Sequence, residues 1–314
     1  MNFSTPVPLS KSKFLIEYSS KIISLGSCFA ENIGEKLNYF KFGNTTNPFG
    51  IIFNPISIEK LVERAVVKNF FTEKDLFYHN ERWHCFEIHS DLSNAGQTEF
   101  LEKLNQLLEK FILLIQTSNF FIITYGTSWI YRNLNDGKVV ANCHKMSQNQ
   151  FTKELLSVEN ILKSIENTIF LIQSVNSDAK FIFTISPVRH IKDGFFENNV
   201  SKAHLFSAIF ELLKNENVAY FPSYEILMDE LRDYRFYKKD MLHPSETAIA
   251  YIWNKFKNSF VNPSVFPAIN DVEVIQKGLQ HKAFNPNSES HQQFLSQLQN
   301  KINLLQQQFP DIQF

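Results

Sequence analysis

The chain alternates between short apolar runs and longer amphipathic stretches, which is typical of an α/β protein. Apolar runs predict buried strands at residues 21–25 (KIISL), 120–125 (FFIITY), 180–185 (KFIFTI) and 218–221. Amphipathic spacing predicts helices at 30–40, 98–116 and 202–213, and a long helical region at about 151–175. This alternation favours a three-layer sandwich with a mostly parallel central sheet, in which ligands bind beyond the carboxyl ends of the strands.

Two segments depart from the alternation. Residues 70–95 are dense in aromatic residues and histidines, and we expect an inserted hairpin or extended segment that covers part of the sheet. From about residue 270 the chain forms a C-terminal extension, in which residues 288–308 are Gln-rich. This stretch has one helical stripe, formed by Phe294, Leu298, Ile302 and Leu305, which predicts a helix docked on the body rather than a coiled-coil partner site. We find no internal repeat and expect a single domain over residues 1–314.

Composition excludes several classes of function. The net charge is -1 and no basic stripe occurs, so we expect no nucleic-acid partner. No secretory signal is evident and no apolar stretch is long enough to cross a bilayer. The three widely spaced cysteines fit a reducing compartment, which favours the cytoplasm. Neither metal-ligand spacing nor a glycine-rich phosphate loop occurs, so we expect no metal and no other cofactor. The sequence assigns no oligomeric state.

The first candidate for chemistry is the turn Gly26-Ser27-Cys28, directly after the first predicted strand. A strand, a sharp turn and a helix together expose the turn residues over the sheet edge and aim the helix N-terminus at them. We expect this to lower the pKa of a thiol there, so Ser27 or Cys28 is a candidate nucleophile. The same pattern also fits a plain tight turn with an inert buried cysteine.

The second candidate is the segment Asp240-Met241-Leu242-His243-Pro244. An Asp and a His three residues apart on a loop can pair the carboxylate with one imidazole nitrogen and leave the other as a base. Pro244 suits the first position of the helix that follows. A surface Asp with a capping His is the alternative.

The two candidates together resemble the layout of SGNH hydrolases, with the nucleophile in the first strand–helix turn and the Asp and His in the last motif. SLGSCFAEN is similar to the signature of the GSCFA family, which is placed within that superfamily. Five further segments look like other motifs of the family: NPFGIIFNP, ITYGTSWIY, NCHK, FTISPVRH and YFPSYEILMDELRDYRFYKKDMLHPS. The resemblance runs from about residue 5 to residue 314, and implies an SGNH or flavodoxin-like fold.

The resemblance also implies roles for individual residues. SGNH enzymes use Gly-Asp-Ser, and the position of that serine falls on Cys28, which makes Cys28 the first choice of nucleophile and Ser27 the second. The oxyanion donors would be the Cys28 backbone amide, Gly50 and an Asn side chain. In place of the usual Gly-x-Asn-Asp, this chain has Gly126-Thr127-Ser128-Trp129. Ser128 or Asn142 would then have to replace the missing Asn.

Other polar residues near the expected edge have less defined roles. Arg189 and His190 follow the third predicted strand, where Arg189 either binds a carboxylate or phosphate of the substrate or pairs with an acid of the DELRD segment. For His144 we expect a structural role. His84 and His89 are weaker candidates for the pocket lining.

These residues lead to three hypotheses. The first is an acyl hydrolase or acyltransferase that acts on an ester or thioester of a small molecule through a covalent acyl-enzyme. The second is a binding protein that kept the fold and lost the reaction. The third is a carbohydrate O-deacetylase with a glycan substrate, which rests on the resemblance to SGNH proteins alone.

Overall fold

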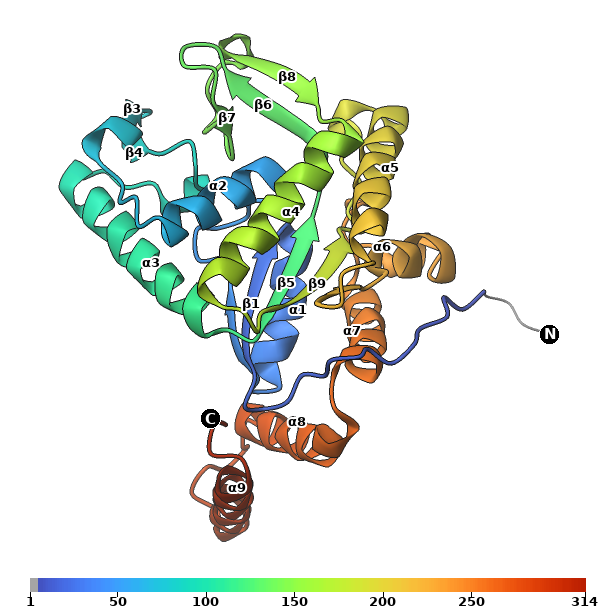
Figure 1. Cartoon of the computed structure of the whole chain (residues 1–314). Helices are drawn as coiled ribbons and strands as arrows, with labels where there is room; N and C mark the ends of the chain where they lie inside the picture. The colour runs from blue at the N-terminus through green and yellow to red at the C-terminus, as the bar shows by residue number, and fades with distance from the viewer. Residues whose placement is uncertain (1–4) are drawn as a thin grey trace.

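A computed structural model describes residues 5–314 and contains a parallel sheet of five strands in the order β10-β9-β5-β1-β2 (Figure 1). The strands are β1 (Lys21–Gly26), β2 (Gly43–Thr46), β5 (Phe120–Tyr125), β9 (Lys180–Ile185) and β10 (Val218–Tyr220). All four pairs of neighbours are parallel. The α/β class and the mostly parallel central sheet are therefore confirmed, and the four predicted strands are all present.

Helices cover both faces of this sheet, which explains why its central strands are apolar throughout. One face packs against α2 (Pro55–Val66), α3 (Gln97–Thr117), α4 (Val158–Val175) and α5 (Phe195–Leu212). The other face packs against α1 (Cys28–Tyr39) and α7 (Glu246–Phe260). Side chains alternate between the two layers, so that Phe121 and Ile123 of β5 enter the first core and Phe120 and Ile122 enter the second.

The second core also joins the two ends of the chain. It includes Ile16 and Tyr18, which precede β1, together with residues of α8 (Phe266–Gln280) and α9 (Glu289–Gln308). The ring of Tyr18 lies 5.0 Å from that of Phe309. Leu298, Ile302 and Leu305 of the predicted stripe are buried, whereas Phe294 remains 36% exposed. The docked C-terminal helix is therefore present.

The segment before α4 differs from the prediction. Residues 151–175 do not form one helical region, because β8 (Phe151–Leu155) pairs antiparallel with β6 (Trp129–Asn133). An ion pair between Arg132 and Glu154, at 2.9 Å, links these strands, and Ser157 then caps α4. With β7 (Val139–Val140) they form a small sheet beyond the carboxyl ends of the main strands (Figure 1).

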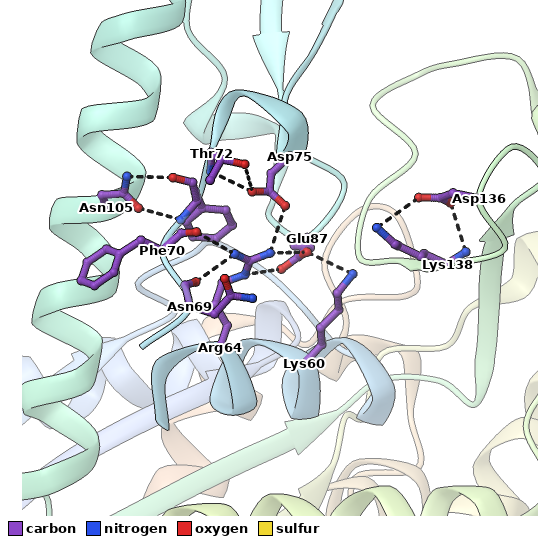
Figure 2. Close-up of polar contacts among 11 residues, drawn as sticks. Lys60, Arg64, Asn69, Phe70, Thr72, Asp75, Glu87, Asn105, Asp136 and Lys138 are labelled. Carbon is purple, nitrogen blue, oxygen red and sulfur yellow. Dashed lines mark hydrogen bonds and ion pairs between the residues drawn. The ribbon is translucent and has the colours of Figure 1, made fainter. Parts of the chain in front are cut away.

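The aromatic-rich insertion contains a hairpin of β3 (Phe77–His79) and β4 (Arg82–His84). An ionic network attaches it to α2 (Figure 2). Arg64 Nη2 lies 2.8 Å from Glu87 Oε1 and 3.1 Å from Asp75 Oδ1, and Lys60 contributes a further contact to Glu87 at 3.0 Å. Arg64 and Glu87 are both nearly buried, so this network fixes the position of the insertion.

The chain between β10 and α7 is irregular. A short helix, α6 (Ser223–Glu225), continues into a π-helical turn (Ile226–Glu230). The helix predicted to begin at Pro244 begins two residues later, because Ser245 is the N-cap and its hydroxyl accepts a hydrogen bond from the amide of Ala248. Within residues 5–314, no helix combines the length and apolarity that crossing a bilayer requires.

Candidate active site

A cavity of about 480 Å³ opens at the carboxyl ends of the strands. Its walls come from the turns after β1, β5 and β9, from the loop before α7, and from the insertion and the segment after β7. Of the residues predicted from the sequence, this cavity is lined by Ser27, Cys28, His89, Asn142, Arg189, His190 and His243. Asp240, Gly50, Gly126 and Ser128 are not part of its lining. The structure therefore brings together two segments that lie at opposite ends of the chain.

The turn after β1 is shaped by a glycine and a cap. Gly26 has φ +130°, and a Cβ at this position would lie 2.1 Å from the carbonyl oxygen of Thr124, so only glycine fits. Ser27 is buried and is the N-cap of α1, where its hydroxyl accepts a hydrogen bond from the amide of Phe29 at 3.2 Å. Cys28 is the first residue of the helix and is only partly buried. The sulfur is therefore the better exposed of the two candidate nucleophiles.

The Cys28 thiol does not have the lowered pKa that the sequence suggested. Burial raises the pKa of Cys28, and the carboxylate of Glu31 raises it further. The cation of Lys202 and the amides at the start of α1 lower the pKa of Cys28, but by less than burial and Glu31 raise it. The thiol is thus protonated at neutral pH, and a nucleophilic role requires a base.

His243, which lines the same cavity, is paired with the carboxylate of Asp240, which lies outside the lining. His243 Nδ1 lies 2.6 Å from Asp240 Oδ2, and Asp240 Oδ1 accepts hydrogen bonds from the amides of Leu242 and His243 at 2.9 and 3.0 Å. These bonds hold the pKa of Asp240 well below its usual range, so it remains a carboxylate. The pairing assigns the Nδ1 proton of a neutral His243 to this bond and leaves Nε2 as the acceptor.

The thiol and the base are not in direct contact. Between Cys28 and His243, both of which lie in the described chain, there is no hydrogen bond, although both line the cavity. Catalytic hydrogen bonds are often long or absent before substrate binds. The arrangement is therefore an open pocket with the thiol on one wall and the paired imidazole on another.

Arg189 holds the loop that carries this imidazole. Its Nη2 donates a hydrogen bond to the carbonyl of Met241 at 2.6 Å, and its guanidinium lies 5.3 Å from the ring centroid of Tyr237. Met241 has φ +60°, a conformation that non-glycine residues rarely adopt, so this bond stabilises an unfavourable turn. No ion pair between Arg189 and the DELRD acids is present in residues 5–314, which excludes the second of its two predicted roles.

His190 is a neutral member of the cavity wall. Burial, with a contribution from the cation of Lys202, lowers the pKa of His190 to about 4. Its Nε2 is buried and has no hydrogen-bond partner among the described residues. A Cβ on Gly126 would lie 3.2 Å from this nitrogen and 3.0 Å from Phe53 Cβ, so Gly126 permits the close packing of this wall without lining the cavity itself.

Two predicted oxyanion donors, Gly50 and Ser128, are already hydrogen-bonded within the protein. The amide of Gly50 donates to the carbonyl of Asn47 at 2.8 Å, and Gly50 lies outside the cavity lining. Ser128 is fully buried, with its hydroxyl bonded to the carbonyl of Ser201 and its amide bonded to the Ser201 hydroxyl at 2.8 Å. These groups are already paired with protein atoms and cannot stabilise an oxyanion.

Three other donors remain. The amide of Cys28 is at the start of α1 and has no intrahelical partner. Asn142 and Asn54 both line the cavity, and each uses its Oδ1 to accept a backbone amide, at 2.7 and 2.9 Å. Their Nδ2 groups have no partner among the described residues. The sequence identified Asn142 but not Asn54, whose signal was only its position before Pro55, typical of a helix cap.

A buried lysine was also missed. Lys202 on α5 is 2% exposed and donates hydrogen bonds to the carbonyls of Gly126 and Ser186, both at 2.7 Å. The predicted helix begins at residue 202, whereas α5 begins seven residues earlier at Phe195. Its spacing from the buried Asn198 and Leu205 places it on the inner face, which is the signal that could have found it.

His84 of the insertion and His144, which follows β7, have mainly structural contacts. His84 and His144 face each other with their Nδ1 atoms 3.1 Å apart, and the Ser93 hydroxyl lies 2.7 Å from His84 Nδ1. His144 Nε2 contacts the carbonyl of Cys85 at 2.8 Å, and burial lowers the pKa of His144 to about 4. Only His89 of the weaker candidates lines the cavity.

Comparisons with known proteins place the chain in a family. The chain belongs to the GSCFA family, whose pattern matches residues 21–256, and the C-terminal domain of GSCFA domain proteins matches residues 272–314. No match is found among curated proteins. Among solved structures, the chain is similar to an acetyl xylan esterase from the rumen bacterium Butyrivibrio proteoclasticus, with a TM-score of 0.39 and 14% identity. The similarity covers 78% of this chain and 65% of that chain.

Proposed function

We propose that this protein is a cysteine-dependent acyl hydrolase or acyltransferase that acts on an ester or thioester. The observation that supports the proposal is that His243 lines the same cavity as the Cys28 thiol and is paired with Asp240 at 2.6 Å. A thiol, an imidazole and a carboxylate that orients the imidazole are the three groups that nucleophilic acyl transfer requires.

The reaction begins with proton transfer. His243 Nε2 takes the proton of the Cys28 thiol, and the thiolate attacks the acyl carbon to form a C–S bond. The negative charge moves to the acyl oxygen, for which the Cys28 amide and the Nδ2 groups of Asn142 and Asn54 are unpaired donors at the cavity. Collapse of this intermediate breaks the bond to the leaving oxygen or sulfur, which receives the proton from His243.

The second half of the reaction regenerates the thiol. His243 removes a proton from water, or from an acceptor hydroxyl, which attacks the thioester on Cys28. Breaking the C–S bond releases the acid or the new ester, and the proton returns to sulfur. Asp240 keeps the imidazole oriented and stabilises its charged form throughout.

Turnover of an acyl-ester panel by the full-length protein tests the proposal. The panel contains p-nitrophenyl acetate and butyrate, an acyl thioester and an acetylated xylo-oligosaccharide, the last because aromatic side chains of Trp129 and Tyr131 line the cavity. We expect Cys28→Ala to lose turnover and the acyl adduct seen by intact-mass spectrometry. The control is Cys143→Ala, which removes the other thiol of the cavity and should retain both. Turnover that survives in Cys28→Ala would reject this mechanism.

Ser27→Ala distinguishes the two nucleophile candidates. The substitution removes the α1 cap, which costs about 1 kcal/mol of stability, but leaves the thiol in place. We expect turnover to be retained in this variant. Loss of turnover in Ser27→Ala together with retention in Cys28→Ala would assign the reaction to the serine.

A catalytically silent binding protein is the second candidate. It is favoured by the absence, in the described chain, of a hydrogen bond between Cys28 and His243, and by the internal pairing of Ser128. This candidate predicts no turnover of any panel member and no effect of His243→Ala on iodoacetamide labelling of Cys28. Labelling at pH 7 that slows in His243→Ala would contradict it.

A further inference from the structure

Lys202 occupies an unusual position for a lysine. It lies between the carboxyl ends of β5 and β9, where its Nζ donates to the carbonyls of Gly126 and Ser186 at 2.7 Å each. The side chain is 2% exposed, so water does not reach the ammonium group. Both acceptors are followed by residues of the cavity wall, Thr127 and Val188 among them.

A charge in this position is costly to bury. Removing an ammonium from water costs several kcal/mol, and proteins usually offset this with an anionic partner. Within residues 5–314, no carboxylate forms an ion pair with Lys202, and the ring of Tyr224, 5.7 Å from Nζ, is its only cation–π contact. Burial accordingly lowers the pKa of Lys202 to about 7. The two carbonyls alone do not explain why a cation is used here.

The nearby group that can become an anion is the Cys28 thiol. Gly126, which accepts from Lys202, follows directly on the β5 residues Thr124 and Tyr125, and the amide of Ser27 donates to the carbonyl of Thr124 at 3.0 Å. The turn that carries the thiol and the turn held by the lysine are therefore adjacent. Each group favours the charged form of the other, and Cys28 is the one group that opposes the effect of burial on the pKa of Lys202.

We propose that Lys202 is a positioning residue of the Cys28 site, which fastens the turns after β5 and β9 and stabilises the negative charge on sulfur once the thiol proton has left. This role rests on the proposed nucleophilic function of Cys28. Lys202 does not touch the substrate, because it is not among the residues that line the cavity. In its protonated form Lys202 supplies a positive charge near the thiolate, while His243 exchanges protons from the cavity lining.

Other groups act on the same sulfur and have to be held constant in a test. The charged and titratable residues that face it or line its cavity are Glu31, His89, Tyr131, Cys143, Arg189, His190, Lys192, Asp193 and His243. All remain in place when Lys202 alone is changed. Lys110 is exposed on α3 and does not line the cavity, so it provides a matched control for the loss of one lysine.

The test is the pH profile of Cys28 labelling by iodoacetamide in full-length protein that carries Cys143→Ala. Lys202→Gln retains two N–H donors without the charge, and Lys202→Met removes both. We expect the midpoint of the profile to rise by about one unit or more in both variants, equivalent to about tenfold slower labelling at pH 7, and to stay unchanged in Lys110→Met. Midpoints in the Gln and Met variants within about 0.3 units of the parent would overturn the proposal.

The readout separates this inference from the proposed function. Labelling requires no acyl substrate, so a shifted midpoint supports the role of Lys202 even if no panel ester is turned over. Conversely, turnover that depends on Cys28, combined with an unshifted midpoint, would retain the acyl-transfer proposal and reject the role of Lys202.

Discussion

The orienting carboxylate provides the sharpest perturbation of the proposed mechanism, through Asp240→Asn. The carboxylate uses Oδ1 for the amides of Leu242 and His243 and Oδ2 for His243 Nδ1. An asparagine keeps one oxygen for the two amides, so the loop should fold as before. Its NH₂ group, however, faces Nδ1 and forces that nitrogen to act as an acceptor. The proton of neutral His243 then lies on Nε2, which can no longer take the thiol proton.

The size of the effect follows from the exposure of the pair. In buried catalytic triads the same substitution lowers kcat by about 10⁴. Here the side chains of His243 and Asp240 are 40% and 46% exposed, so water partly replaces the lost carboxylate. We therefore expect a loss of about 10²–10³ in kcat, roughly 3–4 kcal/mol of transition-state stabilisation.

The assay is single-turnover acylation by whichever panel ester the wild-type protein uses, with the melting temperature measured in parallel. Asp233→Asn is the matched control, because Asp233 is also an exposed loop aspartate that accepts a backbone amide, that of Arg235. We expect the control to retain wild-type rates. A rate for Asp240→Asn within threefold of wild type, with the fold intact, would refute the role of His243 as the oriented base.

Three further predictions concern the loop that carries His243 and the stability of the fold. Arg189→Met removes a charged hydrogen bond to the loop before α7, so we expect about tenfold lower kcat with a nearly unchanged melting temperature; an unchanged kcat would contradict this role. Arg64→Met leaves Glu87 buried without its main partner and should cost about 3 kcal/mol in urea unfolding, whereas the exposed Arg132→Met should cost at most about 1 kcal/mol. Because burial lowers the pKa of His144 to about 4, the unfolded chain binds a proton that the folded chain does not between pH 6.5 and 4. The free energy of unfolding should therefore fall as the pH drops through this window, and His144→Asn should flatten that decline; an equal slope in urea titrations of both proteins would show otherwise.

Three of the four predicted strands are covered on both faces, whereas the fourth, β10, is a partly buried edge strand. β1, β5 and β9 appear as apolar runs because no alternate position faces water. The edge strand β2 (GNTT) is short and polar and carries no such signal. The predicted helical region includes β8 because this strand directly precedes α4. Its pairing with β6 depends on a partner that is distant in the sequence.

The site was predictable to the extent that topology determined it. Parallel strands end at one edge, so the turn with Cys28 and the residues after β9 had to be neighbours, and the loop with His243 also reaches that edge. The sequence could not predict which polar groups lack a hydrogen-bond partner within the protein. The amide of Gly50 and the hydroxyl of Ser128 are paired with local partners that only the folded chain reveals. The burial of Lys202 follows from its spacing to Asn198 and Leu205 only when α5 is known to begin at Phe195 and not at residue 202.

The second core can form only after nearly the whole chain has been synthesised. Ile16 and Tyr18 near the beginning of the chain share a core with Leu298 and Ile312 near its end. The ribosome must therefore synthesise almost three hundred further residues before the C-terminal residues can pack against β1 in this core. During that interval the apolar side chains of the nascent segment are exposed, and we expect chaperones to occupy the place that α8 and α9 later fill.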